Sequence, residues 1–284
     1  MFAVLPTPMM LDGSLDMESL DRVVDHYLIG GAVGLVPVSI AGEGDLLDDA
    51  ERLRVVRRVV CRSAGRASVV VAVLAGRIDR ALAQAHAAAN CGATGLLVKP
   101  PMGSAQEVLE HVGAIARSVR LPIILLDNPK VGARLPMSLV QALVDTVPQV
   151  CGIKLEEEPT AVKMAMVRAQ LGTRIRIFGG LGGVHCLHEL EHGADGFFTG
   201  YPHPELLVTV MDRFRHGDLA GAAAAYEAFL PVAMKERGHA ATMIRQRKTI
   251  LFDCGVIRNA TVRMGANSPA FATAQTAGSH PVQC

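Results

Sequence analysis

The sequence predicts a (β/α)8 barrel followed by a C-terminal helical extension. Three observations support this fold class. Short apolar runs alternate with longer helical patterns, eight such pairs occur in the ~250 residues that a barrel of this kind requires, and the runs are almost continuously apolar. Successive parallel strands need a crossover between them, and strands covered on both faces are apolar throughout. A doubly wound sheet is the structural alternative, but it usually has fewer strands, and no G-x-G-x-x-G follows the first run.

The segments between the apolar runs carry apolar residues at three- and four-residue spacing, as amphipathic helices do. One example is Leu20, Val23, Val24 and Tyr27. Pro136 or Ser138 can start the fifth helix, and Pro159 with Thr160 can start the sixth. The predicted strands are residues 1–5, 33–38, 68–74, 94–98, 122–126, 150–154, 174–178 and 196–199.

The barrel is predicted to span residues 1–216, with its eighth helix over residues 204–215. An extension over residues 217–267 follows, with helical patterns at 218–236 and 239–252. We expect these helices to pack on the barrel or on another subunit, and we therefore expect a homodimer or homotetramer. Residues 268–284 are rich in Ala, Ser, Thr, Gly and Pro, which predicts a flexible tail.

Composition excludes several classes of function. The net charge is +1, aromatic residues make up 4%, and tryptophan is absent, so neither a basic nor a base-stacking nucleic-acid surface is expected. No apolar stretch reaches the roughly 18 residues of a membrane span. The six cysteines form no C-x-x-C pair and predict reduced thiols. These features indicate a cytoplasmic globular protein without membrane or nucleic-acid partners.

The stretch "VCGIKLEEE" places Lys154 at the end of the sixth apolar run. In a (β/α)8 barrel the chemistry lies where the strands end. A lysine held there in apolar surroundings is a candidate nucleophile, since desolvation favours the free amine. A lysine that marks where the strand reaches the surface is the alternative, and Lys99 at the end of the fourth run is a rival amine.

Eight fragments of the chain occur in the order and spacing of a known family. They are AVLPTPM, DGSLDMESL, GEGDLLDDAER, GATGLLVKPP, LPIILLDNP, GIK, IFGGLGG and GADGFFTG. The chain thus resembles the dihydrodipicolinate synthase / N-acetylneuraminate lyase family of lysine-dependent aldolases and dehydratases. The resemblance implies that Lys154 forms an imine with pyruvate or another small 2-oxo acid and that no cofactor is needed.

The chain departs from the family at three places. The turn after strand two usually reads Gly-Thr-Thr-Gly-Glu or Gly-Ser-Thr-Gly-Glu, with hydroxyls that bind the keto-acid carboxylate. Here it lacks both central hydroxyls and reads Ser39, Ile40, Ala41, Gly42 and Glu43. Leu126 and Met102 stand where the family has tyrosines, one of which is the proton shuttle. The chain is therefore expected to be a divergent member that moves protons by other means.

Several residues are assigned to the site on these grounds. Ser39, Ala41, Gly42 and Glu43 are expected to bind substrate through the turn, although Glu43 can instead have a structural role. Glu156 shares the strand face of Lys154 and can replace tyrosine as the base if burial raises its pKa; a solvated helix entry is the alternative. The remaining expected substrate-binding residues are Asn128, Gly180 and Phe198, and a phosphate cradle is the alternative for the GGLGG segment.

His185, His188 and His192 lie at spacings of three and four, which suggests a metal site and a metal-dependent aldolase. They flank a core-facing stripe, and we expect no metal. The function that the sequence favours is an aldolase or hydro-lyase that acts on a small 2-oxo acid or keto-deoxy sugar acid through a Lys154 imine. The alternative is a non-catalytic protein that binds such an acid, motivated by the missing tyrosines and hydroxyls. The metal-dependent aldolase is the third hypothesis.

Overall fold

Eight parallel strands form a closed barrel in the order of the sequence, each paired with the next and β8 paired with β1. The structure is a computed structural model that describes residues 1–235 and 240–263, so the predicted tail at 268–284 lies outside the described residues. The predicted fold class is confirmed. The strands are β1 Phe2–Val4, β2 Gly34–Val36, β3 Ser68–Val73, β4 Gly95–Val98, β5 Ile123–Asp127, β6 Val150–Leu155, β7 Arg176–Gly179 and β8 Gly196–Thr199.

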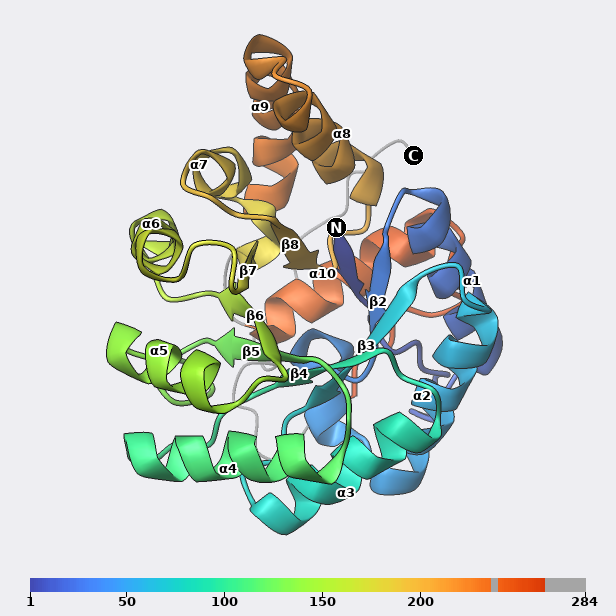
Figure 1. Ribbon diagram of the computed structural model, residues 1–284. Coiled ribbons are helices and arrows are strands. Elements are labelled where there is room, and N and C mark those ends of the chain that lie inside the picture. The colour runs from blue at the N-terminus through green and yellow to red at the C-terminus, as the bar shows by residue number, and fades with distance from the viewer. Residues whose placement is uncertain (236–239, 264–284) are drawn as a thin grey trace.

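Helices surround the strands in a ring (Figure 1). Their apolar faces are buried against the barrel, and acidic or hydroxyl side chains cap several of them. Asp48 and Ser104, for example, each accept a hydrogen bond from the backbone of the first helical turn. The helices are α1 Met17–Ile29, α2 Asp49–Ser63, α3 Ile78–Asn90, α4 Ala105–Ser118, α5 Met137–Thr146, α6 Thr160–Leu171, α7 Cys186–Glu191, α8 Pro204–Arg215, α9 Leu219–Lys235 and α10 Ala240–Asp253.

The barrel interior is filled by side chains that the strands direct inward. They form a separate apolar cluster inside the ring of strands, so the barrel is a packed core rather than a pore. Phe2, Phe178 and Phe198 contact one another there, with centroid distances from 4.5 to 5.6 Å. The cluster consists of Val4, Val36, Val70, Leu97, Ile124, Leu126, Phe178 and Phe198.

The C-terminal helices lie outside the eight strand–helix units. α9 packs against α8 and α7 and buries Phe229, whereas α10 contacts the short 3-10 helix η1 (Ile40–Gly42) that follows β2. Figure 1 shows α8 and α9 projecting together from the ring, and α10 crossing one end of the barrel. The exact boundary between barrel and extension remains a prediction.

Two further findings concern the composition-based predictions. Within residues 1–235 and 240–263, no helix has the length and apolar character that crossing a membrane requires. Cys61, Cys91, Cys151 and Cys186 carry free thiols. The prediction of reduced thiols is thus confirmed for these four cysteines.

Candidate active site

A cavity of about 520 Å³ opens where the strands end, beneath α10. In a (β/α)8 barrel this is the face on which catalytic residues lie. Its walls are mostly apolar, and only a few polar groups converge on it, as is typical of a small-molecule site. The residues that line it are Val4, Ser39, Ile40, Ala41, Leu74, Leu97, Leu126, Asn128, Lys130, Val131, Lys154, Glu156, Leu181, Gly182, Phe198, Thr199, Gly200, Met243 and Arg247.

Lys154 points into this cavity because of its register in the barrel. It pairs with Leu126 on β5 and Phe178 on β7, and both of these side chains belong to the interior cluster. Paired residues on neighbouring strands project to the same side of a sheet, so the Lys154 side chain also projects inward. The residue is only 8% exposed, although it carries a charged group. The rival amine, Lys99, is not among the residues that line the cavity.

Glu156 lies beside Lys154, as expected for residues two apart on a strand. One carboxylate oxygen, Oε1, lies 3.0 Å from Lys154 Nζ and accepts a hydrogen bond from the backbone N–H of Leu181 at 3.1 Å. The other oxygen, Oε2, accepts a hydrogen bond from Asn128 Nδ2 at 2.8 Å. Both oxygens are therefore partnered and the carboxylate is fixed in position. Glu156 is not part of a solvated run at the entry to α6.

The pKa of Glu156 lies below its ordinary value. Burial alone would raise it, but the charge of Lys154 and the hydrogen bonds from Lys154, Leu181 and Asn128 together outweigh burial. This direction is opposite to the rise that we expected from burial. Glu156 is consequently ionised at neutral pH and able to accept a proton.

The turn after β2 contributes Ser39 and Ala41 to the cavity wall, but its last two residues face elsewhere. The Ser39 hydroxyl is buried and has no hydrogen-bond partner in the described part of the chain. Gly42 accepts a hydrogen bond through its carbonyl from Thr7 at 2.6 Å. Glu43 is 2% exposed; it forms an ion pair with Lys248 and accepts a hydrogen bond from the backbone N–H of Arg263 at 2.6 Å. These contacts fit the structural role that was the alternative to substrate binding for Glu43.

The position of the Glu156 carboxylate explains why residue 180 is a glycine. A Cβ at this position would lie 2.2 Å from Glu156 Oε1, so any side chain would displace the carboxylate. Gly180 itself is not among the lining residues, whereas the next two residues of the GGLGG segment, Leu181 and Gly182, are. The other two residues expected to bind substrate, Asn128 and Phe198, both line the cavity.

Sequence reasoning missed most of the cavity wall, including three residues with long side chains. Lys130 lies in the loop after β5, and Met243 and Arg247 come from α10. Arg247 is 3% exposed, which is unusual for an arginine. Arg247 lies in a segment that we predicted to be a helix packed on the barrel, and this was a signal that it could reach the cavity. The periodicity of the segment does not show which side of such a helix faces a ligand.

The structure separates the three histidines that suggested a metal. His188 and His192 lie on the surface with Glu191, and their possible ligand atoms are within 4.8 Å of one another. His185 instead lies beside Glu158, with Nε2 and Oε1 3.3 Å apart. None of the three lines the cavity. A metal at this surface group would therefore not act on a ligand beside Lys154.

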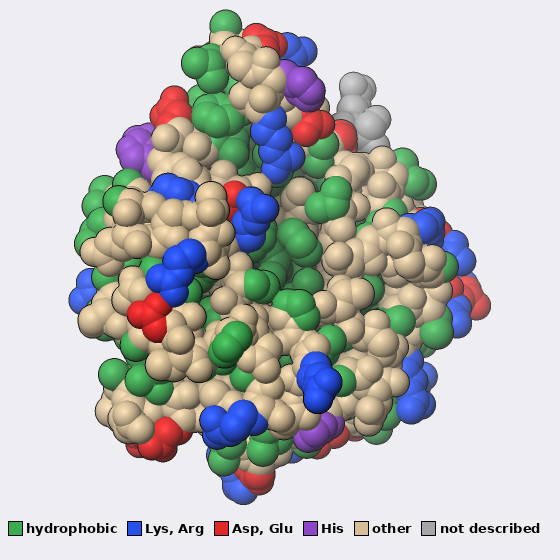
Figure 2. Space-filling model, viewed as in Figure 1, with side chains coloured by type: hydrophobic (Ala, Val, Ile, Leu, Met, Phe, Trp, Pro, Cys, Tyr) green, Lys and Arg blue, Asp and Glu red, His purple; other side chains and the backbone are tan. Residues whose placement is uncertain are grey.

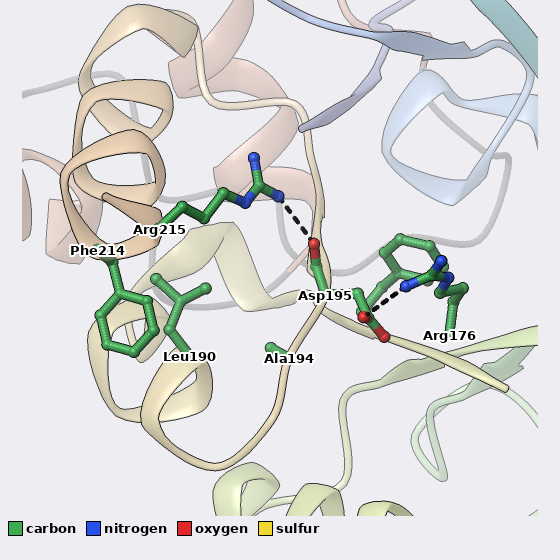
Figure 3. A pocket seen from close by; sticks show the side chains of 7 residues that line it. Arg176, Leu190, Ala194, Asp195, Phe214 and Arg215 are labelled. Carbon is green, nitrogen blue, oxygen red and sulfur yellow. Dashed lines mark hydrogen bonds and ion pairs between the residues drawn. The ribbon is translucent and has the colours of Figure 1, made fainter. Parts of the chain in front are cut away.

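A second cavity, of about 560 Å³, lies at the opposite end of the barrel, where β7 and β8 begin. Its charged groups interact with one another. Asp195 accepts a hydrogen bond from Arg176 at 3.1 Å through its carboxylate and from Arg215 at 2.9 Å through its backbone carbonyl (Figure 3).

In Figure 2, hydrophobic side chains gather in a hollow at the centre of the face viewed, with Lys and Arg side chains around it. The amino-terminal face of such barrels contributes to stability rather than to catalysis.

The fold and the cavity define a class of protein, namely (β/α)8 barrels with a buried lysine at the end of the sixth strand. Comparison with known proteins identifies the family. The model of the Dihydrodipicolinate synthetase family matches residues 1–271. The chain belongs to this family, so the expected resemblance is confirmed.

Individual relatives include enzymes of two activities. A 4-hydroxy-tetrahydrodipicolinate synthase of Sorangium cellulosum is 34% identical over 236 residues, which cover 81% of this chain and 78% of the relative. An L-2-keto-3-deoxyarabonate dehydratase of Azospirillum brasilense is 26% identical over 263 residues, covering 90% and 84%. The crystal structure of dihydrodipicolinate synthase from Rhodopseudomonas palustris superposes with a TM-score of 0.87 at 28% identity, covering 94% of this chain and 91% of that one. Lyase chemistry is common to these relatives.

Proposed function

We propose that this protein is a lyase that acts on a small 2-oxo acid through an imine at Lys154. The observation that carries the proposal is the pairing of a buried lysine with a buried carboxylate in a mostly apolar cavity at the catalytic end of the barrel. Membership in a family that contains a synthase and a dehydratase supports it. The reaction, whether aldol cleavage, condensation or loss of water, depends on the substrate.

Glu156 is suited to move the protons that imine formation requires. Its carboxylate takes a proton from the Lys154 ammonium, and the free amine adds to the C2 carbonyl of the acid. The protonated Glu156 then returns the proton to the resulting hydroxyl, which leaves as water. One ammonium and one ketone give one iminium and one water, so the Lys154–Glu156 site keeps its charge throughout. The iminium then acts as the electron sink for bond cleavage.

The positions that carry tyrosine in relatives have different surroundings here. Leu126 lines the cavity, whereas Met102 is 74% exposed and lies outside the lining. In the described part of the chain no tyrosine lines the cavity. Glu156, fixed by Asn128 and Leu181, is the group in the lining that can exchange a proton with Lys154 directly. We assign the role of the proton shuttle to this carboxylate.

The remaining assignments follow from the same cavity. Ser39 and Ala41 bind the carboxylate of the acid, for which the unpartnered Ser39 hydroxyl supplies a donor. Asn128 and Phe198 contact the remainder of the ligand. No metal or cofactor takes part, the protein acts in the cytoplasm, and it forms a homodimer or homotetramer.

Reductive trapping tests the proposal. The protein is incubated with a panel of 2-oxo acids and borohydride, and peptide mass spectrometry should find the reduced ligand at Lys154. Lys154→Arg keeps the charge and should abolish labelling, whereas the control Lys99→Arg should leave labelling unchanged because Lys99 does not line the cavity. Labelling that persists in Lys154→Arg would show that the assignment is wrong.

A protein that binds a keto acid without reacting is the second candidate. The absence of tyrosine from the described lining of the cavity favours it. It predicts that a 2-oxo acid raises the melting temperature of the wild type while borohydride traps no adduct.

A further inference from the structure

The cavity is large for the ligand atoms that the proposed chemistry uses. Forming the imine involves only the carboxylate, the ketone and the adjoining carbon of a 2-oxo acid, and pyruvate contains all of these. A cavity of about 520 Å³ lies in the range that holds drug-sized ligands. The cavity can therefore hold a ligand with a longer chain, and the character of its wall indicates which kind of chain.

Most of the wall is apolar. Ten of the nineteen lining residues in the described part of the chain have side chains without oxygen or nitrogen, so a chain that extends from the ketone meets mainly apolar groups. Val4, Leu97, Leu126 and Phe198 line the cavity and belong at the same time to the apolar cluster inside the barrel. This part of the wall is thus a continuation of the barrel core.

Further apolar side chains come from two loops and from α10. Ile40 and Ala41 in the turn after β2, and Val131 in the loop after β5, pack against the same cluster and also line the cavity. Met243 on α10 lines it from the end of the barrel that this helix crosses (Figure 1). The apolar surface therefore surrounds a ligand from several elements and is not one isolated patch.

The polar groups of the wall are largely engaged with the protein itself. Lys154 pairs with Glu156. The amide of Asn128 is held at both ends, since Nδ2 donates a hydrogen bond to Glu156 at 2.8 Å and Oδ1 accepts one from the backbone N–H of Lys130 at 3.0 Å. The Lys130 side chain lies at an exposed position, so water solvates its ammonium.

The remaining polar groups offer few partners to hydroxyls on a ligand chain. The Thr199 hydroxyl accepts a hydrogen bond from the backbone N–H of Tyr201 at 3.3 Å, and Arg247 has a partner as well. The Ser39 hydroxyl is assigned to the carboxylate next to the ketone. A chain hydroxyl placed against the apolar wall would lose its hydrogen bonds to water without replacement, which weakens binding.

We infer that the substrates are 2-oxo acids whose chain beyond the ketone is apolar, and that hydroxylated chains such as those of keto-deoxy sugar acids bind less well. The inference rests on the proposed function, since the ketone of the same molecule reacts with Lys154. Moving one methylene group from water to an apolar wall strengthens binding about fourfold. A chain of a few carbons is therefore enough for strong discrimination.

A matched pair of ligands tests the inference. 2-Oxoheptanoate and 5-methoxy-2-oxopentanoate have chains of equal length and differ at one position, where a CH₂ group of the first is an ether oxygen in the second. The two acids compete at equal concentration under borohydride, and mass spectrometry quantifies the two adducts at Lys154. The same competition for n-butylamine gives the intrinsic ratio of the two ketones. We expect the wild type to favour 2-oxoheptanoate about fivefold or more beyond that ratio, because the buried oxygen loses its hydrogen bonds to water.

Variants of the wall test whether its apolar character causes the preference. Val131→Thr/Met243→Gln introduces polar atoms at two partly exposed wall positions with little change in side-chain size, and should reduce the preference to about twofold or less because the ether gains hydrogen-bond donors. Val162→Thr/Met166→Gln makes the same two changes at exposed positions of α6 outside this cavity and should keep the full preference. Thermal melts establish that each variant folds. If the double variant of the wall does not fold, each of its single variants should show part of the loss.

The possible results separate this inference from the proposed function. A wild type that shows only the intrinsic ratio or favours the ether, or a preference that the double variant of the wall retains in full, would overturn the inference while the Lys154 imine stands. If neither acid labels the protein, the proposed imine chemistry is wrong. In that case, a larger rise in melting temperature with 2-oxoheptanoate than with the ether would still support the apolar ligand site, and equal effects or no effect would overturn both proposals.

Discussion

Glu156 is ionised although it is buried, because Lys154, Asn128 and Leu181 together stabilise its negative charge. Glu156→Gln keeps the size of the side chain and removes the base. We expect turnover to fall by ~10²–10⁴-fold, the usual contribution of a general base, while the imine still accumulates during long incubation. Steady-state kinetics and trapping at Lys154 measure the two effects separately.

Glu157→Gln is the matched control for this experiment. Glu157 forms ion pairs with Arg134 and Lys163 and does not line the cavity, so its variant should retain near-normal turnover. Equal turnover in the two variants would assign the proton transfer to another group.

Glu189 gives the molecule a pH-dependent stability. Burial raises its pKa to about 7, despite a hydrogen bond from Thr160 that lowers it, and the charge of Glu156 raises it further. In the unfolded chain such a carboxyl titrates near 4.5. Between these values the folded state binds more protons than the unfolded state, so the free energy of unfolding falls as pH rises, by up to about 3 kcal/mol. Above the higher value this group has no further effect.

Glu189→Gln should remove this contribution while keeping an oxygen that accepts the hydrogen bond from Thr160. The variant should gain stability relative to the wild type at pH 8, and the gain should be smaller at pH 5. Thermal or urea unfolding at the two values measures it. The same difference between variant and wild type at both pH values would contradict the assignment.

The loop between β7 and η3 (Leu181–Gly183) fixes the Glu156 carboxylate through the Leu181 amide and through the absence of a side chain on Gly180. Gly180→Ala should displace the carboxylate from Lys154 and reduce turnover at least tenfold, with a small change in melting temperature. Gly76→Ala is the matched control, since the nearest atom to its added Cβ would be 4.0 Å away. Equal activities of the two variants would show that turnover does not depend on the position of this loop.

α10 is also tied to the turn after β2. Lys248 is fully buried, pairs with Glu43, and donates a hydrogen bond to the carbonyl of Thr261 at 2.7 Å. Lys248→Met leaves the Glu43 carboxylate buried without this partner, which typically costs ~3–5 kcal/mol. The double variant Glu43→Gln/Lys248→Met should recover a large part of that loss, as urea unfolding would show. Additive losses would mean that the two side chains do not interact.

The elements and the site differ in how far the sequence predicts them. All eight predicted strands exist within two residues of their expected ends, because buried parallel strands leave a nearly continuous apolar signal. The neighbourhood of Lys154 and Glu156 follows from the two-residue period of one strand. The contact between Glu43 and Arg263 joins residues 220 apart, and Arg247 reaches the cavity only because α10 docks across the barrel. Local periodicity contains no information about such docking.

Apolar side chains remain exposed on the C-terminal helices. Leu219 and Met234 on α9 and Phe252 on α10 are 61%, 45% and 47% exposed, respectively. These residues lie in the extension that we expect to contact another subunit, and burying them favours association. Light scattering at micromolar concentration should give two or four times the mass of one chain. A mass of one chain under these conditions would contradict the predicted homodimer or homotetramer.

The position of α10 near the end of the chain affects how the protein is made. The eight strands are complete at Thr199, so a growing chain can close its barrel while α10 is still in the ribosome. At that length Lys154 is already in place, but the helix that carries Arg247 and Lys248 is missing. A newly made barrel therefore has Lys154 in position before α10 covers the end of the barrel at which this lysine lies.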